Sequence, residues 1–119
     1  MLAHSSPHAE SLPAPVLIHI AEDCIDKARA IGQDVARSMA AAEVTEYQKL
    51  ISTGLGCLEM AMAAKKLVPR LEARLCLRYA SILIEETTNL TEAETALTRG
   101  ISVCEKVRAT FHRALLETS

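Results

Sequence analysis

Residues 69–88 read PRLEARLCLRYASILIEETT, and this stretch decides the fold class. It opens on a proline, which is well suited to the first turn of a helix, where no backbone N–H is needed. Apolar residues then occupy almost every side of the predicted helix. Such a helix must be buried on most sides, so we expect neighbours before and after it. Its polar residues keep mainly to one line, at spacings of four, three and four: Arg74, Arg78, Ser81 and Glu85.

Three further helices are predicted from apolar residues that recur with helical spacing. They run from about Pro15 to Met39, from Glu43 to Lys66 and from Thr91 to Leu116. The last begins TEAE, which fits a capping box in which the Thr91 hydroxyl and the Glu94 carboxylate satisfy free amides of the first turn. Its predicted apolar stripe is Ala93, Leu97, Gly100, Ile101, Cys104, Val107 and Phe111.

The links between these helices, near residues 40–42, 67–69 and 88–90, are very short. Short links force consecutive helices to lie antiparallel. We therefore predict an all-α fold of tandem antiparallel helical hairpins, forming one domain of two hairpins over residues 16–119. Residues 1–15 show no periodicity, and we expect them to be a disordered tail.

The composition agrees with packed helices. Half of the residues are apolar but only 3% are aromatic, whereas β-sheets draw on aromatic and β-branched pairs. The net charge of −2 comes from interspersed acids and bases, so no basic face for direct nucleic-acid binding is expected. No secretory signal opens the chain, and no apolar run approaches the roughly 20 residues that span a membrane. We expect an intracellular protein.

Motifs for catalysis or cofactor binding are missing. The sequence has no Gly-rich phosphate loop, no HExxH and no nucleophile elbow. His4 and His8 lie four residues apart, but Pro7 between them argues against the helix that would join them on a metal. We therefore expect no enzyme, no cofactor and no metal site. The four cysteines are interpreted as small buried apolar residues: Cys24, Cys57, Cys76 and Cys104.

A weak internal repeat relates the second and fourth predicted helices. A shift of 46 residues aligns Ile51 with Leu97 and Gly54 with Gly100. A glycine midway along a helix costs about 1 kcal/mol relative to alanine. Two glycines at equivalent points therefore predict that a neighbouring helix crosses close to the backbone at each. Chance similarity between two amphipathic helices is the alternative.

The third and fourth helices also resemble a tetratricopeptide (TPR) repeat. Leu77 and Ala80 match the first helix of such a repeat, and residues 89–93 resemble its turn, although Thr88 stands where glycine is usual. The resemblance implies a TPR-like α-solenoid fragment, in which each hairpin buries its faces by stacking on neighbours.

The stretch from Pro69 to Glu105 carries a more specific pattern, which includes polar positions that helix packing alone does not require. Its members are Glu72-Ala73-Arg74, Leu77-Arg78-Tyr79-Ala80, Leu83, Glu85-Glu86-Thr87, Asn89, Glu92-Ala93-Glu94, Leu97 and Gly100-Ile101. This pattern is similar to the N-terminal repeats of the cohesin loading factor family, the TPR subunit of the cohesin loader, particularly its fungal members. The resemblance covers about residues 16–106. Members of that family are several times longer, so we expect this chain to correspond to their N-terminal portion.

The resemblance implies a non-enzymatic nuclear protein. The family's subunit forms a TPR superhelix around an extended segment of a Nipped-B-like HEAT-repeat partner, and together they load cohesin onto chromatin and support sister-chromatid cohesion. Two alternatives remain open: a generic TPR-like peptide-binding adaptor, and a self-associating helical bundle.

In TPR hairpins the first helix lines the inner groove. The resemblance therefore implies partner-binding residues on the third helix, at Arg74, Arg78, Tyr79, Ile82 and Glu85. Arginine pairs with carboxylates or peptide carbonyls, and tyrosine combines apolar area with a hydroxyl. The alternative is that Arg78 and Glu85 are solvated or pair within the helical bundle.

Overall fold

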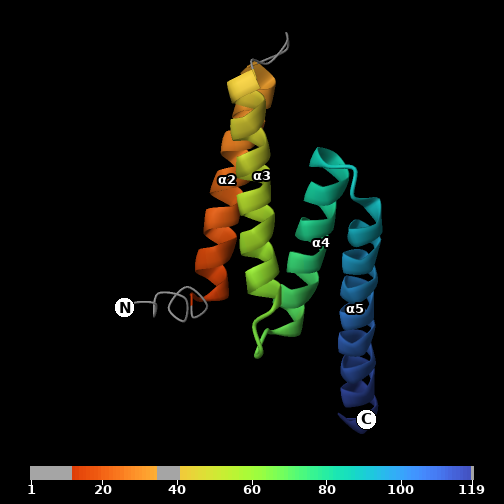
Figure 1. The fold of residues 1–119 in the computed structure, drawn as a ribbon. Coiled ribbons are helices and arrows are strands. Elements are labelled where there is room, and N and C mark those ends of the chain that lie inside the picture. Colours follow the sequence, from red (N-terminus) through yellow and green to blue (C-terminus); the bar gives the residue numbers. More distant parts are fainter. Residues whose placement is uncertain (1–11, 35–40, 119) are drawn as a thin grey trace. The chain divides into compact units, whose positions relative to one another are not determined.

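The computed structural model describes residues 12–34 and 41–118, and it confirms the all-α class (Figure 1). No strand occurs in those two ranges. The chain divides into two compact units, residues 1–64 and 65–119, which are taken one at a time below. The first unit contains α2 (Ala14–Asp34) and α3 (Ala41–Met62), and the second contains α4 (Pro69–Glu86) and α5 (Leu90–Thr118).

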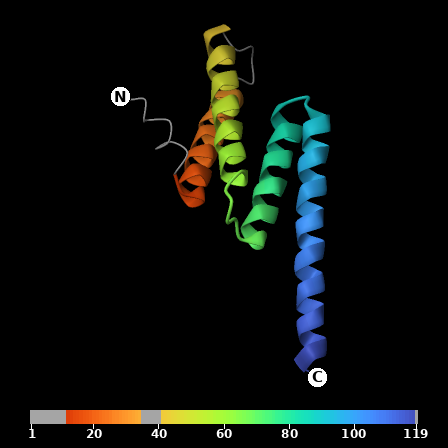
Figure 2. The ribbon, with the colours of Figure 1, turned by 60° about the horizontal axis from the view of Figure 1, so that its bottom comes forward.

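The first unit is an antiparallel hairpin of α2 and α3, which lie side by side in both views (Figures 1 and 2). Every third or fourth residue of α2 faces α3, as expected for an amphipathic helix. The opposite face is polar, and Asp23 and Lys27 form an exposed ion pair on it at 3.0 Å. The buried apolar residues are Leu17, Ala21, Ile25 and Ala28 of α2, and Ile51, Leu58, Ala61 and Met62 of α3.

The second unit is the hairpin of α4 and α5, and it too is antiparallel (Figure 2). Small residues on α5 allow a close approach of the two helices: Ala93, Ala96, Gly100 and Val103 are buried. Two polar contacts cross the hairpin. The Tyr79 hydroxyl donates to Glu92 Oε2 at 2.6 Å, and Arg99 Nε donates to Glu72 Oε2 at 2.8 Å.

Each hairpin has a buried glycine at a point where its two helices approach closely. A Cβ placed on Gly54 would lie 2.9 Å from Ile25 Cδ1 and 3.3 Å from the Ala21 carbonyl oxygen. A Cβ on Gly100 would lie 3.2 Å from the Cβ of Cys76. The close crossings predicted from the internal repeat are therefore confirmed at both positions.

Several predicted boundaries need correction. Helix α3 ends at Met62, four residues before the expected Lys66. The reason is a tightening of its last turn, in which the Ala63 amide is shared between the carbonyls of Glu59 and Met60, and the Ala64 amide bonds to Ala61. At the other end of the chain, Ala14 and Pro15 already belong to α2. The rest of the predicted tail, up to residue 11, lies outside the described residues, as do His4, His8 and the predicted end of the first helix at Met39.

The predicted capping box of α5 is also corrected. The helix begins at Leu90, so Thr91 is its second residue and its carbonyl accepts a bond from the Thr95 hydroxyl. The first turn is instead linked to Asn89, whose side-chain amide donates to Glu92 Oε1 at 2.6 Å. The backbone N–H of Asn89 in turn donates a hydrogen bond to the hydroxyl oxygen of Thr87 at 3.1 Å. This short connection fixes the entry of α5.

Candidate functional site

The polar line of α4 forms an exposed edge of the second unit. Arg74 and Glu85 are exposed, and Arg78 and Ser81 between them are half-buried. The Ser81 hydroxyl donates to the Arg78 carbonyl of its own helix at 3.0 Å. The charged groups at the surface of this edge are therefore those of Arg74, Arg78 and Glu85, all three of which were predicted as partner-binding residues. Contact with a partner stays a prediction for these three.

Tyr79 and Ile82, the other two residues predicted to bind a partner, lie inside the hairpin and not on this edge. Ile82 is 0% exposed and Tyr79 only 4% exposed. The hydroxyl of Tyr79 donates a hydrogen bond to Glu92 within the hairpin. A buried tyrosine needs such a partner, because its hydroxyl cannot bond to water there. The sequence pattern did not distinguish these two side chains from the polar edge, because Tyr79 directly follows Arg78 and Ile82 directly follows Ser81 along the helix.

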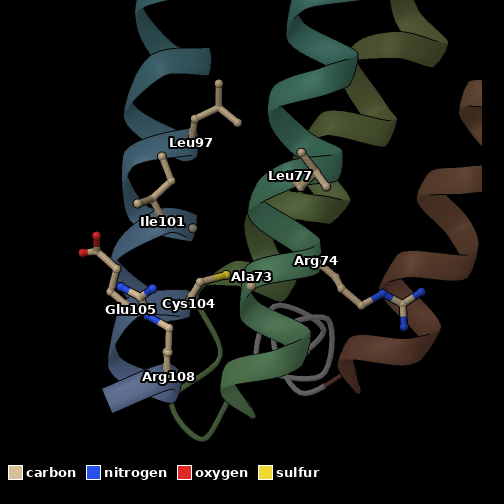
Figure 3. Close-up of a pocket in the computed structure, with 9 residues that line it drawn as sticks. Ala73, Arg74, Leu77, Leu97, Ile101, Cys104, Glu105 and Arg108 are labelled. Carbon is tan, nitrogen blue, oxygen red and sulfur yellow. The ribbon is translucent and has the colours of Figure 1, made fainter. Parts of the chain in front are cut away.

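An apolar groove lies beside the polar edge, between α4 and α5, and Arg74 of that edge is one of its lining residues (Figure 3). We call it the outer groove; its volume is about 570 Å³. Leu77 of α4 and Ile101 of α5 line it while remaining 61% and 59% exposed. Charged residues stand only at its margins. The full lining is Ala73, Arg74, Leu77, Leu97, Gly100, Ile101, Cys104, Glu105 and Arg108.

The groove continues past Leu97 toward the turn between the two helices. A second hollow there is lined by Ile84 and Leu90, both of them large and exposed, and shares Leu97 with the first. Monomeric proteins seldom leave contiguous apolar surface uncovered, and such a surface between helices is a usual place for another helix or an extended peptide to dock. The two hollows of the second unit therefore form its candidate protein-binding surface.

Sequence reasoning missed the contribution of α5 to this surface. The predicted stripe on that helix treats Leu97, Ile101 and Cys104 as core together with Ala93 and Gly100. In the structure the two sets separate: the small residues pack on α4, whereas Leu97 is half-buried and Ile101 and Cys104 are exposed. The spacing held a signal for part of this separation: at about 100° per residue, Leu97 and Ile101 lie to one side of Ala93 on the helix, whereas Gly100 lies to the other.

The four cysteines differ in how far they are buried. Cys76 is buried, Cys24 and Cys57 are half-buried and Cys104 is exposed, so the expectation of burial fails for Cys104. Burial raises the pKa of the Cys76 thiol, and burial also raises that of Cys57. Both thiols are therefore poor nucleophiles at neutral pH.

Across residues 12–34 and 41–118, no group of three or more His, Cys, Asp or Glu side chains is placed to hold a metal ion. Within the same ranges, no helix combines the length and the apolar character needed to cross a bilayer.

Helical hairpins that present an apolar groove with a charged edge define a class of protein-interaction modules. The family model of the cohesin loading factor matches residues 14–111, which is most of the chain. The chain belongs to the cohesin loading factor family. No curated protein and no solved structure matched it significantly.

Membership gives the coarse features of its role. The family indicates a part in cohesin loading, and hence protein–protein interactions and a nuclear function on chromatin. It is not known as a family of enzymes.

Proposed function

We propose that this chain is a TPR-like scaffold that binds an extended segment of a Nipped-B-like HEAT-repeat partner, and that it thereby supports cohesin loading and sister-chromatid cohesion in the nucleus. The observation that carries the proposal is the family match over residues 14–111. Two antiparallel hairpins, each with a glycine at its helix crossing, are consistent with the repeated unit of an α-solenoid.

The charged edge of α4 is the proposed contact for the extended segment. Arg74, Arg78 and Glu85 project from one side of the helix over about three turns, so they meet a peptide that runs along the helix. Guanidinium groups bond to carboxylates and peptide carbonyls, and Glu85 accepts from amides or basic side chains. Tyr79 supports this edge from inside by holding α4 against Glu92 of α5.

The test is a binding titration of the 119-residue chain with the N-terminal segment of the Nipped-B-like partner. Arg74→Glu and Arg78→Glu are each expected to weaken binding about 10-fold or more, because a charge-assisted hydrogen bond contributes about 1.5–3 kcal/mol. Arg113→Glu makes the same change of charge at an exposed position of α5 and serves as the control.

Three results would count against the proposal. The unmodified chain could fail to bind the segment, although its circular dichroism shows that it is folded. All three variants could bind equally, which would move the contact away from α4. Finally, Arg78→Glu could unfold the chain, which would make Arg78 a structural residue.

A further inference from the structure

The polar edge of α4 reaches one turn beyond Arg74, to Arg70 at the start of the helix. Arg70, Arg74 and Arg78 follow one another at spacings of four, so they stand within about 80° of one another around the helix. We call these three residues the arginine row. Arg70 and Arg74 are exposed and Arg78 is half-buried, and the Arg74 side chain extends away from α5 (Figure 3). The row is therefore a line of positive charge along the first half of α4.

Neighbouring acids do not neutralise this line of charge. Between Met60 and Ile84 the sequence has five Lys and Arg residues and a single acid, Glu72. Glu72 points to nearly the opposite side of α4 from Arg70 and Arg74, since two residues correspond to about 200° around a helix. Its carboxylate already accepts a hydrogen bond from Arg99 of α5 at 2.8 Å. Across residues 12–34 and 41–118, Arg70 and Arg74 form no hydrogen bond or ion pair.

The arginine row opposes the stability of the helix that carries it. Like charges four residues apart on a helix repel each other. The first turns of a helix carry partial positive charge and its last turns partial negative charge, so cations are disfavoured at the start and acids at the end. The edge has Arg70 and Arg74 near the start of α4 and Glu85 near its end. This order is the reverse of the one that stabilises a helix, and an anionic ligand along the row would relieve the repulsion.

The spacing of the row matches that of an extended peptide. Four residues of a helix rise about 6 Å, which separates successive arginines of the row along its axis. In an extended chain, alternate side chains point to the same side and lie about 6.6 Å apart, because each residue adds about 3.3 Å. Three acids at alternate positions therefore face all three arginines in turn. Three contiguous acids face only two of them, because the middle side chain points away.

The far end of the edge favours a peptide over a nucleic acid. Glu85 lies on the same side of α4 as the row, about 22 Å along the axis from Arg70. A phosphate backbone carries negative charge along its whole length, so Glu85 would repel it there. A peptide can change from acidic to basic over the same distance.

We propose that the arginine row binds an acidic stretch of the partner's extended segment, in which Asp or Glu residues occupy three alternate positions and a basic residue lies on the Glu85 side. The inference rests on the proposed function, because the stretch is part of the segment that lies along α4. It adds the chemistry that the segment must carry at this point and the spacing of its charges.

The first test compares two synthetic peptides of identical composition, titrated into the full 119-residue chain and followed by fluorescence anisotropy. One peptide has three glutamates at alternate positions, separated by serines, and the other has the three glutamates side by side. The alternating peptide should bind about 10-fold more tightly, because it makes one more charge-assisted contact. Equal binding of the two peptides, or no binding of either, overturns the proposal.

The second test removes single arginines. Arg70→Gln and Arg74→Gln should each weaken binding of the alternating peptide about 10-fold. Arg113→Gln makes the same change at an exposed position of α5 and should leave the affinity unchanged. Glutamine has a helix propensity close to that of arginine, so the variants at Arg70 and Arg74 should melt no lower than the unmodified chain. Variants that bind normally, or that melt well below the unmodified chain, contradict the proposed role of the row.

Two further probes separate this inference from the proposed function. If the chain binds the Nipped-B-like segment and Arg70→Gln and Arg74→Gln leave that affinity unchanged, the arginine row is not the contact, while the scaffold function stands. If the chain binds the alternating peptide but not the segment, the scaffold function fails and the row keeps its acidic ligand. A short DNA duplex that binds more tightly than the alternating peptide and displaces it would overturn the proposal in favour of a nucleic acid.

Discussion

Two glycines of α3 offer a controlled measurement of helix packing. Gly54 and Gly56 are two residues apart in the interior of one helix, so replacing either by alanine removes the same cost of glycine in a helix, about 1 kcal/mol. Their surroundings differ. A Cβ on Gly56 would meet nothing within 4 Å, whereas a Cβ on Gly54 would approach Ile25 Cδ1 to 2.9 Å and Cγ1 to 3.2 Å.

The expected change in the free energy of unfolding depends on which atoms must move when a Cβ is added at Gly54. Ile25 is fully buried, so its side chain has little room to turn away. The new Cβ would also stand 3.3 Å from the Ala21 carbonyl oxygen, which belongs to the backbone and cannot rotate aside. Forcing a methyl group into such a contact costs about 1–3 kcal/mol. Gly56→Ala should therefore stabilise the chain by about 1 kcal/mol. Gly54→Ala should range from neutral to destabilising by about 2 kcal/mol, so the two variants differ by about 1–3 kcal/mol.

Urea unfolding followed by circular dichroism measures both variants against the unmodified chain. The difference between the two midpoints is the decisive quantity, since it cancels the common effect of helix propensity. If Gly54→Ala stabilises the chain as much as Gly56→Ala does, then α2 and α3 are not in close contact at Gly54. The account of the repeated glycines would then be refuted.

Four other predictions concern the second hairpin. Tyr79→Phe removes the hydroxyl that donates to Glu92 and should cost about 1–2 kcal/mol in the free energy of unfolding, measured by denaturant titration; no change would mean that water replaces that bond. Gly100→Leu should cost roughly 1–3 kcal/mol, because even the first added carbon meets Cys76 at 3.2 Å; a thermal melt with an unchanged midpoint would contradict this. A thiol reagent should label exposed Cys104 quickly and buried Cys76 only on unfolding, as mass spectrometry of the labelled peptides can show. Because burial raises the pKa of Cys76 above its ordinary value of 9.0, the folded state keeps that proton longer, so stability is full below about pH 9 and falls as the pH rises further. A rise in stability over that range would have the wrong sign.

Much of the fold was accessible from local pattern. The nearly all-round apolar character of residues 69–86 located α4, with Pro69 at its start as expected. The end of α3 was not accessible in the same way, because Ala63 to Lys66 are good helix formers and nothing in the local sequence stops them. The start of α5 was misplaced because a capping box was present in the sequence, whereas Asn89 and Glu92 form the contact.

The candidate site was only partly accessible. Helical spacing placed Arg74, Arg78 and Glu85 on one line, since periodicity alone determines which residues share a side of a helix. It did not show that Tyr79, next to Arg78, turns inward to Glu92, thirteen residues later in the chain. That contact depends on how two helices meet.

The sequence by itself determined that this chain is helical, where each helix begins to within two residues, and which family it belongs to, because propensity, periodicity and a motif are local properties. Only the tertiary structure decided which side of each stripe is covered. Gly100 and Val103 are buried because α4 crosses there, while Ile101, one residue from Gly100, stays exposed because it points about 100° away around the helix. The apolar stripe in the sequence shows how much apolar surface a helix carries. The packing of the two helices determines how much of that surface is buried.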